Sequence, residues 1–249
     1  MPIEVGQHNR EIQANAEHWR RKPLLQKIYR DFYVKIAGEL RRDLPGQTVE
    51  IGSGIGNLKT VVPEALATDI FPNPWLDRVE NAYWLSFADG SISNLILFDV
   101  WHHLQYPGTA LAEFRRVLTR GGRMIIFDPA MGLLGRIVYG LFHHEPLGLR
   151  DGISWWAPPG FSPDEMIYYA AQANAHRIFV SGECAAELSE WRIVRRSLLP
   201  GISYVASGGF SGPQLYPQSL LPVFRGIDRL ASLLPAIFAT RLLVSLEKK

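Results

Sequence analysis

Between residues 47 and 128 the chain repeats short apolar runs separated by polar turns, and this repetition sharply limits the folds open to it. The runs are TVEIG, ALATDI, NAYWLS, NLILFDV and GRMIIFDP. Continuous apolar runs of this length are typical of parallel strands buried on both faces. The intervening stretch PGTALAEFRRVLTRGG has one apolar stripe at helical spacing, with Gly121 as a C-terminal stop. The alternation predicts a doubly wound α/β sheet.

Further patterns flank this region on both sides. Residues 11–42 have apolar residues at helical spacing and a break near Pro23, which predicts two helices. Residues 130–162 are apolar, aromatic and proline-rich without strand periodicity, so we expect an inserted helix and a loop. The segment SPDEMIYYAAQAN starts with a helix-cap signal at Ser162. Two late strands, WRIVRRSLL and TRLLVSLEK, are expected around an amphipathic helix near residues 218–234.

Composition and charge argue against several classes of protein. The 249 residues are 47% hydrophobic, enough for a large core, and the 26 basic and 24 acidic residues are interspersed, which argues against a nucleic-acid-binding surface. Cys184 is the only cysteine, so no internal disulfide or cysteine zinc cluster can form. The N-terminus lacks a signal-peptide apolar core, and Pro235 and Arg241 interrupt the longest apolar stretch. We therefore expect a cytoplasmic protein with no transmembrane segment.

The segment VEIGSGIGN, residues 49–57, joins an acid to three glycines at every second position. A dinucleotide-binding loop has two residues between its second and third glycines, whereas only one separates Gly54 from Gly56. Glu50, two residues before Gly52, would be poorly placed beside a pyrophosphate but well placed for a cation. Glycines let the backbone turn sharply and approach a ligand closely. The loop predicts binding of a neutral or cationic group.

VEIGSGIG resembles the first motif of class I S-adenosylmethionine-dependent methyltransferases. ATDI resembles that family's second strand, with its ribose-binding acid at Asp69. LSFADGSISNLILFDVWHHLQYP and EFRRVLTRGGRMIIFDP are similar to the fourth-strand region and to the following helix and fifth strand of the type-11 branch. The resemblance covers roughly residues 47–130, in order and at family spacing. It implies a Rossmann-like, mostly parallel seven-stranded sheet with an antiparallel last strand and a helical cap.

The resemblance also implies S-adenosylmethionine as cofactor and a set of residues that contact it. These are Glu50, Gly52, Ser53, Gly54, Gly56, Asp69, Ile70, Asn81, Ala82, Phe98 and Asp99. Asn81 stands where many relatives carry an acid that accepts from the adenine amino group, and its side-chain carbonyl can still accept one hydrogen bond. A helix cap is the alternative role for Asp69, and a buried strand end is the alternative for Phe98 and Asp99.

Histidines supply the candidates for catalysis. His102 or His103 could act as a general base if the acceptor is a hydroxyl, and packing at the start of the next helix is the alternative. Adjacent histidines project in different directions on a helix, so we expect no metal site. His143, His144 and Glu145, in the insertion, are further acceptor-site candidates.

We therefore expect a single methyltransferase domain spanning residues 1–249. Cap helices are expected in residues 1–45, a cofactor-binding core in 46–129, an acceptor-cap insertion in 130–162 and the C-terminal part of the sheet in 163–249. The expected function is methyl transfer to a small-molecule acceptor. A non-catalytic S-adenosylmethionine-binding module and a nicotinamide-dependent reductase are the alternatives, although a reductase needs the longer glycine spacing.

The acceptor itself is suggested by two apolar stripes beside arginines, in residues 131–147 and 220–238. Such stripes are compatible with an acceptor that has an apolar or lipid-linked part, and with peripheral membrane contact. Packing of both stripes on the sheet is the alternative, with a small polar metabolite or sugar as acceptor.

Overall fold

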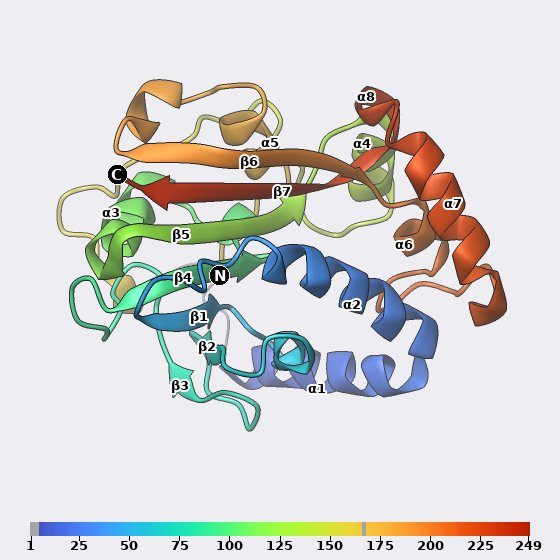
Figure 1. Ribbon diagram of the computed structural model, residues 1–249, viewed down its shortest axis with the longest axis horizontal. Coiled ribbons are helices and arrows are strands. Elements are labelled where there is room, and N and C mark those ends of the chain that lie inside the picture. Colours follow the sequence, from blue (N-terminus) through green and yellow to red (C-terminus); the bar gives the residue numbers. More distant parts are fainter. Residues whose placement is uncertain (1–4, 166–167) are drawn as a thin grey trace.

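The structure, a computed structural model, describes residues 5–165 and 168–249 and contains a seven-stranded sheet with the order β3-β2-β1-β4-β5-β7-β6 (Figure 1). The strands are β1 (Gln47–Ile51), β2 (Leu66–Asp69), β3 (Arg78–Val79), β4 (Ile92–Phe98), β5 (Leu118–Pro129), β6 (Trp191–Pro200) and β7 (Ala239–Lys248). Neighbours among β1 to β5 pair in parallel, and β7 runs antiparallel to both β5 and β6. The predicted sheet, including its antiparallel last strand, is confirmed.

Helices cover both faces of the sheet. They are α1 (Val5–Arg21), α2 (Pro23–Ala37), α3 (Pro107–Val117), α4 (Leu133–Leu141), α5 (Asn174–Phe179), α6 (Ile202–Ala206), α7 (Leu221–Ala231) and α8 (Pro235–Phe238). The two N-terminal helices predicted around Pro23, the helix of the insertion and the late amphipathic helix are all present. Pro23 begins α2, where a missing amide proton costs no helical hydrogen bond.

The apolar runs of the sequence form two cores, one on each face. Successive strand residues point to opposite faces, so Leu95 and Leu97 of β4 pack in the core beneath α3 and α5, whereas Ile96 packs beneath α2. Trp101 and Phe114 are fully buried in the first core. Burial on both faces explains why these strands are continuous apolar runs.

Two boundaries differ from the sequence prediction. The helix α3 ends at Val117 and Leu118 already pairs with Ile92, so Gly121 lies inside β5 at φ +74° and does not end the helix. The run NAYWLS forms only an isolated bridge between Asn81 and Trp84. The backbone amides that follow bond to side chains and not to a neighbouring strand. The Leu85 amide donates to the Glu113 carboxylate, and the Ser86 amide donates to the Glu80 carboxylate.

The prediction of a helix that starts at Ser162 is also wrong in its length. A 3₁₀ turn, Pro163–Glu165, forms there, the expected residues 166–167 lie outside the described part, and residues 168–173 are not helical. Their backbone groups bond to other segments: the amide of Ala171 donates to the carbonyl of His102, and that of Ala173 to Leu147. Tertiary pairing therefore replaces the local helix, and α5 begins only at Asn174.

Candidate functional site

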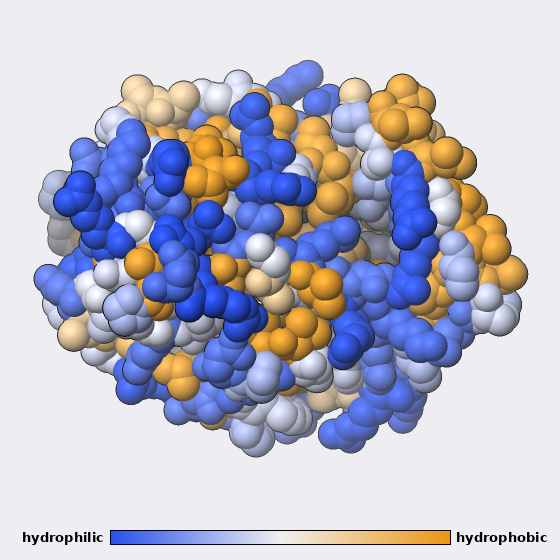
Figure 2. All heavy atoms as spheres, viewed as in Figure 1, coloured by the Kyte–Doolittle hydropathy of each residue, from blue (hydrophilic) through white to orange (hydrophobic). Residues whose placement is uncertain are grey.

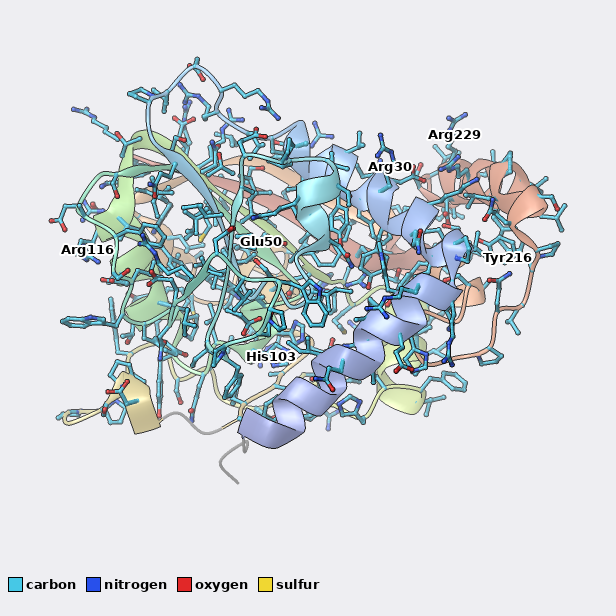
Figure 3. The ribbon with its side chains drawn as sticks, turned by 90° about the horizontal axis from the view of Figure 1, so that it is seen from below. Arg30, Glu50, His103, Arg116, Tyr216 and Arg229 are labelled. Atoms are coloured by element: carbon cyan, nitrogen blue, oxygen red, sulfur yellow. The ribbon has the colours of Figure 1, made fainter. Side chains whose placement is uncertain are left out.

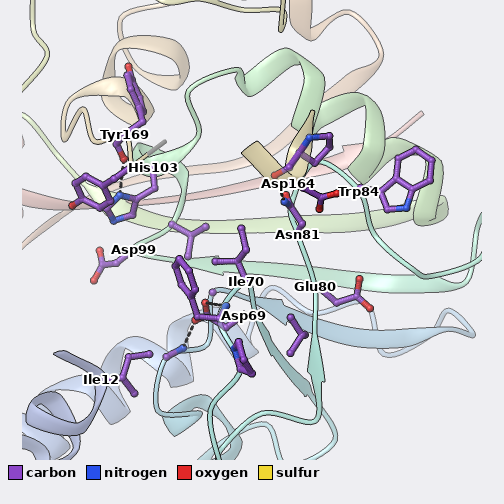
Figure 4. Close-up of a pocket in the computed structure, with 18 of the residues that line it drawn as sticks. Ile12, Asp69, Ile70, Glu80, Asn81, Trp84, Asp99, His103, Asp164 and Tyr169 are labelled. Atoms are coloured by element: carbon purple, nitrogen blue, oxygen red, sulfur yellow. Dashed lines mark hydrogen bonds between the residues drawn. The ribbon is translucent and has the colours of Figure 1, made fainter. Parts of the chain in front are cut away.

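A cavity of about 1080 Å³ opens at the carboxyl ends of β1, β2 and β4, which is where open α/β sheets bind ligands. Its wall combines α1, the glycine loop, the segments after β2 and β3, and the turn after β4. The lining residues are Ile12, Asn15, Gly52, Gly54, Asp69, Ile70, Phe71, Pro72, Val79, Glu80, Asn81, Trp84, Ser86, Asp99, Val100, His103, Pro163, Asp164, Tyr168 and Tyr169. In Figure 4, Trp84 and Asn81 lie on one side of Asp69, and Asp99 and His103 on the other.

The glycine loop is fixed in a conformation that needs glycine. Gly52, Gly54 and Gly56 have φ values of 68°, 54° and 68°, a region that side chains with a Cβ rarely adopt. The Ser53 amide donates to the carbonyl of Thr68 at 2.8 Å, which ties the loop to β2. A Cβ on Gly54 would meet no atom within 4 Å, so this residue faces the open cavity and lets a ligand approach the backbone.

Asp69 ends β2 and is only 6% exposed, yet its side chain lies in the cavity wall. Its carboxylate accepts from the amide of Gly54 at 3.0 Å and from the amide of Phe71 at 3.4 Å. The same side chain thus holds the glycine loop and faces the cavity. A carboxylate so placed suits a diol, because it can accept from both hydroxyls.

Glu50 lies in the interior of the molecule (Figure 3) and is not among the residues that line the cavity. The residue is 4% exposed, and burial raises the pKa of its carboxyl to about 8, with a smaller contribution from the charge on Asp69 and opposition from the Ser53 hydroxyl. The carboxyl is therefore mostly protonated at pH 7. The sequence predicts a charged Glu50 beside a cation, whereas in the structure Glu50 is a buried, largely neutral carboxyl outside the cavity wall.

The Asn81 end of the cavity is polar on one wall and aromatic on the other. The side-chain amide of Asn81 donates to the carbonyl of Pro163 at 3.0 Å, and its oxygen accepts from the amide of Tyr83 at 3.0 Å. Trp84 lines the same end and is 73% exposed. Ala82 is half-buried against the core and is not part of the wall.

At the opposite end, Asp99 has a positive φ of 55°, unusual for a residue other than glycine. Such conformations cluster at functional sites because the surrounding structure must hold them. Here the holding contact is an ion pair with Arg241, which is buried and lies 4.7 Å from the centre of the Tyr204 ring. Phe98 stacks on Phe127, outside the cavity wall. Sequence reasoning treated Arg241 only as a break in an apolar stretch and missed this pairing.

The two candidate catalytic histidines have different surroundings. His102 is 4% exposed, and its Nδ1 lies 3.0 Å from Oδ1 of Asp128. Burial disfavours its charge, but Asp128 and Glu145 together raise the pKa of His102 to about 10. His103 lines the cavity, and burial together with the charge on His102 lowers the pKa of His103 to about 4. Of the two, therefore, His103 is the neutral imidazole that an acceptor can reach.

The expectation that the two rings project apart is wrong. Both belong to a 3₁₀ turn, Trp101–His103, and their ring centres are 4.1 Å apart. Both rings also approach Glu145, a residue of the insertion. Sequence reasoning missed Asp128, although the motif FDP ends β5 at the same edge of the sheet and could have pointed to it.

Part of the chain is similar to a known protein family. Residues 49–126 match the methyltransferase-domain family of type 11. No curated protein sequence matches the chain.

Solved structures share the fold over nearly the whole chain. A S-adenosylmethionine-dependent methyltransferase from Archaeoglobus fulgidus has 12% identity and a TM-score of 0.53, covering 90% of this chain and 94% of its own. A Thermotoga maritima protein, described as a possible histamine N-methyltransferase, has 14% identity and a TM-score of 0.51, covering 96% and 99%. The matched region, the strand order and the glycine loop agree: residues 49–126 are similar to the type-11 methyltransferase domain, and the described chain has the fold of S-adenosylmethionine-dependent methyltransferases.

Proposed function

We propose that the protein transfers the methyl group of S-adenosylmethionine to a small-molecule acceptor with an apolar part, bound at the His103 end of the cavity. The observation that carries the proposal is the continuity of this cavity, which joins the glycine loop and Asp69 to His103, Tyr168 and Tyr169. Its volume of about 1080 Å³ is at the upper end of the range of roughly 300–1000 Å³ usual for ligand pockets. That volume suits a cofactor and an acceptor together.

The wall suggests how the cofactor is held. Asp69 accepts from the ribose hydroxyls, the open face of Gly54 receives the methionyl part, and Asp99 stands beside it. Asn81 and Trp84 flank the adenine, with the polar Asn81 side chain on the side of the amino group. Glu50 and Ser53 support the loop from below.

The bound cofactor supplies a methyl group already activated by its sulfonium. The task of the chain is therefore to align the acceptor and exclude water. Ile12 of α1 and the aromatic rings of Tyr168 and Tyr169 form the walls that would exclude water. Asp99, fixed by Arg241, keeps the turn after β4 in place.

Replacing Asp69 with alanine is expected to weaken S-adenosylmethionine binding by roughly 10- to 100-fold, since a charge-assisted hydrogen bond is worth about 1.5–3 kcal/mol. Calorimetric titration measures the change, and circular dichroism checks that the fold is kept. Asp89→Ala is the control, because Asp89 is an exposed carboxylate that pairs with Arg116 far from the cavity wall. Equal affinity in Asp69→Ala and wild type would remove the ribose assignment.

An exposed apolar patch supports the apolar part of the acceptor. It gathers large side chains of α4, α7, α8 and the residues next to them, and we call it the α4/α7/α8 patch: Leu133, Ile137, Leu141, Phe142, Leu220, Val223, Ile227, Leu230, Leu233, Leu234 and Ile237. Figure 2 shows apolar side chains along the edge where α7 and α8 lie. Leu141 and Phe142 are 74% and 81% exposed, so these side chains do not pack on the sheet.

The patch has the chemistry of a bilayer-contacting surface. Arg136 of α4 and Arg229 of α7 are exposed beside it, and Arg229 lies at the edge of the molecule in Figure 3. Apolar helix faces bordered by arginines bind interfaces that carry anionic lipids. The chain also runs directly from Phe142 to Glu145, which contacts His102 and His103. No helix in residues 5–165 and 168–249 is long and apolar enough to cross a membrane.

Liposome co-sedimentation tests this patch. The double variant Leu141→Ser with Phe142→Ser is expected to lower binding to anionic vesicles at least roughly ten-fold, because each side chain contributes about 1.5–3 kcal/mol when buried. Ile193→Ser is the matched control, because Ile193 is an exposed apolar residue of β6 outside the patch. Wild-type protein that leaves vesicles unbound would contradict membrane contact.

Labelled-methyl transfer to cell extracts, followed by mass spectrometry, tests the activity itself. The proposal predicts labelled product in the lipid fraction. Labelling of a water-soluble sugar alone would refute the apolar acceptor while keeping methyl transfer. Cofactor binding with no product in any fraction would favour a non-catalytic module.

A further inference from the structure

Three potential metal ligands converge beside the acceptor end of the cavity. The Nε2 atom of His102 lies 3.5 Å from Oε2 of Glu145, and Nε2 of His103 lies 3.8 Å from Oε1 of the same residue. One ligand atom from each of the three residues lies within 4.8 Å of the others. The cluster is sheltered, since the side chains of His102 and Glu145 are 4% and 8% exposed, and His103 faces the cavity.

Hydrogen bonds at Nδ1, on the far side of each ring, orient both imidazoles toward Glu145. Nδ1 of His103 lies 3.0 Å from the carbonyl oxygen of Tyr169, which can only accept, so Nδ1 carries the proton and donates. Nδ1 of His102 likewise faces Oδ1 of Asp128 at 3.0 Å. Both Nε2 atoms are thereby directed at the shared carboxylate. An imidazole whose other nitrogen donates to a carboxylate or a carbonyl is the usual arrangement around a bound metal.

Hydrogen bonds from neighbouring side chains also hold the carboxylate of Glu145 in place. The hydroxyl of Tyr168 and the side-chain amide of Gln172 both donate to oxygens of Glu145. Two carboxylates, those of Asp128 and Glu145, contact the single ring of His102 in a sheltered place. Negative charge on these carboxylates favours a cation nearby, either a proton on His102 or a metal ion.

We propose that His102, His103 and Glu145 bind a divalent transition-metal ion such as Zn²⁺ at the acceptor end of the cavity. Imidazole nitrogen and carboxylate oxygen ligate zinc at about 2.0–2.2 Å, which sets tetrahedral ligand atoms roughly 3.3–3.5 Å apart. The observed separations of 3.5 and 3.8 Å run to different oxygens of Glu145, and the three ligand atoms lie within 4.8 Å of one another. Closing around an ion therefore needs side-chain movements of up to about 1 Å. His143 lies beside the cluster, but its Nδ1 accepts from the backbone amide of Glu145 at 3.3 Å, so we do not include it among the ligands.

The role of such an ion in catalysis rests on the proposed function, methyl transfer to a bound acceptor. His103 brings the ion to the cavity, where a remaining coordination position would face an acceptor oxygen. A hydroxyl bound to such an ion would lose its proton more readily, to solvent water as the acceptor enters the cavity. Its oxygen would then attack the methyl carbon, with the carbon–sulfur bond electrons returning to sulfur. The binding of the ion can be measured without the reaction.

Metal binding is tested on the untagged 249-residue protein with Zn²⁺, in competition with a chromophoric chelator, and with Co²⁺, whose visible absorption reports its ligand geometry. Wild type is expected to bind about one equivalent of either ion. Glu145→Gln and His103→Gln are expected to weaken binding at least roughly 100-fold, and Asp128→Asn, which alters an outer contact, by about 10- to 100-fold. His144→Ala is the control, because His144 is an exposed neighbour whose ring stacks on His143.

Two results would overturn the metal site. One is wild-type protein that retains no Zn²⁺ or Co²⁺ against the chelator. The other is equal binding by wild type and Glu145→Gln, with circular dichroism showing that both are folded. S-adenosylmethionine binding is titrated on the same samples, so a protein that binds the cofactor and no metal refutes this site and leaves the proposed function standing.

Discussion

Replacing Gly52 with valine is expected to abolish measurable S-adenosylmethionine binding, a loss of at least roughly 100-fold. Gly52 has a φ of 68°, which a β-branched residue adopts only with strain of about 1–3 kcal/mol. A Cβ at this position would also lie 2.4 Å from Cγ2 of Val100. Val100 lines the cavity, so its displacement disturbs both the loop and the turn after β4.

Calorimetric titration and thermal unfolding together separate binding from folding in this variant. Gly182→Val is the matched control, because Gly182 has a φ of 81° but a Cβ there would meet no atom within 4 Å. The Gly182→Val variant has the same kind of backbone strain but no steric clash, and Gly182 lies outside the cavity wall. Cofactor affinity in Gly52→Val equal to that of the control would show that the loop is not the binding element.

Glu50→Gln is expected to flatten the pH dependence of stability and to make the protein more stable than wild type at pH 8. Burial raises the pKa of Glu50 from 4.5 to about 8 in the folded state. Between these values the folded chain holds a proton that the unfolded chain has released. The free energy of unfolding of wild type therefore falls by about 1.4 kcal/mol per pH unit as pH rises through this window, a total on the order of 4 kcal/mol.

Urea unfolding of both proteins at pH 5, 6.5 and 8 measures this effect, and the difference between the proteins isolates the one carboxyl. The variant should match wild type near pH 5 and exceed it progressively above. Glu190→Gln is the control, because Glu190 is an exposed carboxylate paired with Arg115. Parallel profiles for wild type and Glu50→Gln would contradict a protonated carboxyl beneath the glycine loop.

The sheet and the glycine loop could be predicted because their causes are local. Burial on both faces makes β4 a continuous apolar run, and the left-handed turns demand Gly52, Gly54 and Gly56 at fixed spacing. The type-11 resemblance then placed Asp69 and Asp99 at the carboxyl ends of strands and gave Asn81 as the adenine contact, and all three lie in one cavity wall. Parallel strands end at the same edge of a sheet, so the order of the motifs along the chain was sufficient to predict that these residues lie together.

The acceptor end could not be predicted in the same way, because its contacts join distant segments. The pairs of His102 with Asp128 and with Glu145, and of Asp99 with Arg241, connect residues from different elements. The 3₁₀ turn that brings the histidines together also departs from the helical geometry assumed for them. Likewise, the helix expected at Ser162 gave way to backbone bonds with His102 and Leu147, which no local cap signal reports.

The central claim is that this cavity is a S-adenosylmethionine site. Calorimetric titration of the wild-type protein with S-adenosylmethionine, and separately with NADH, tests it most directly. We expect saturable binding of S-adenosylmethionine at about one equivalent per chain and no heat from NADH, because the glycine spacing does not suit a pyrophosphate. Binding of NADH, or no binding of S-adenosylmethionine by folded protein, would contradict the account.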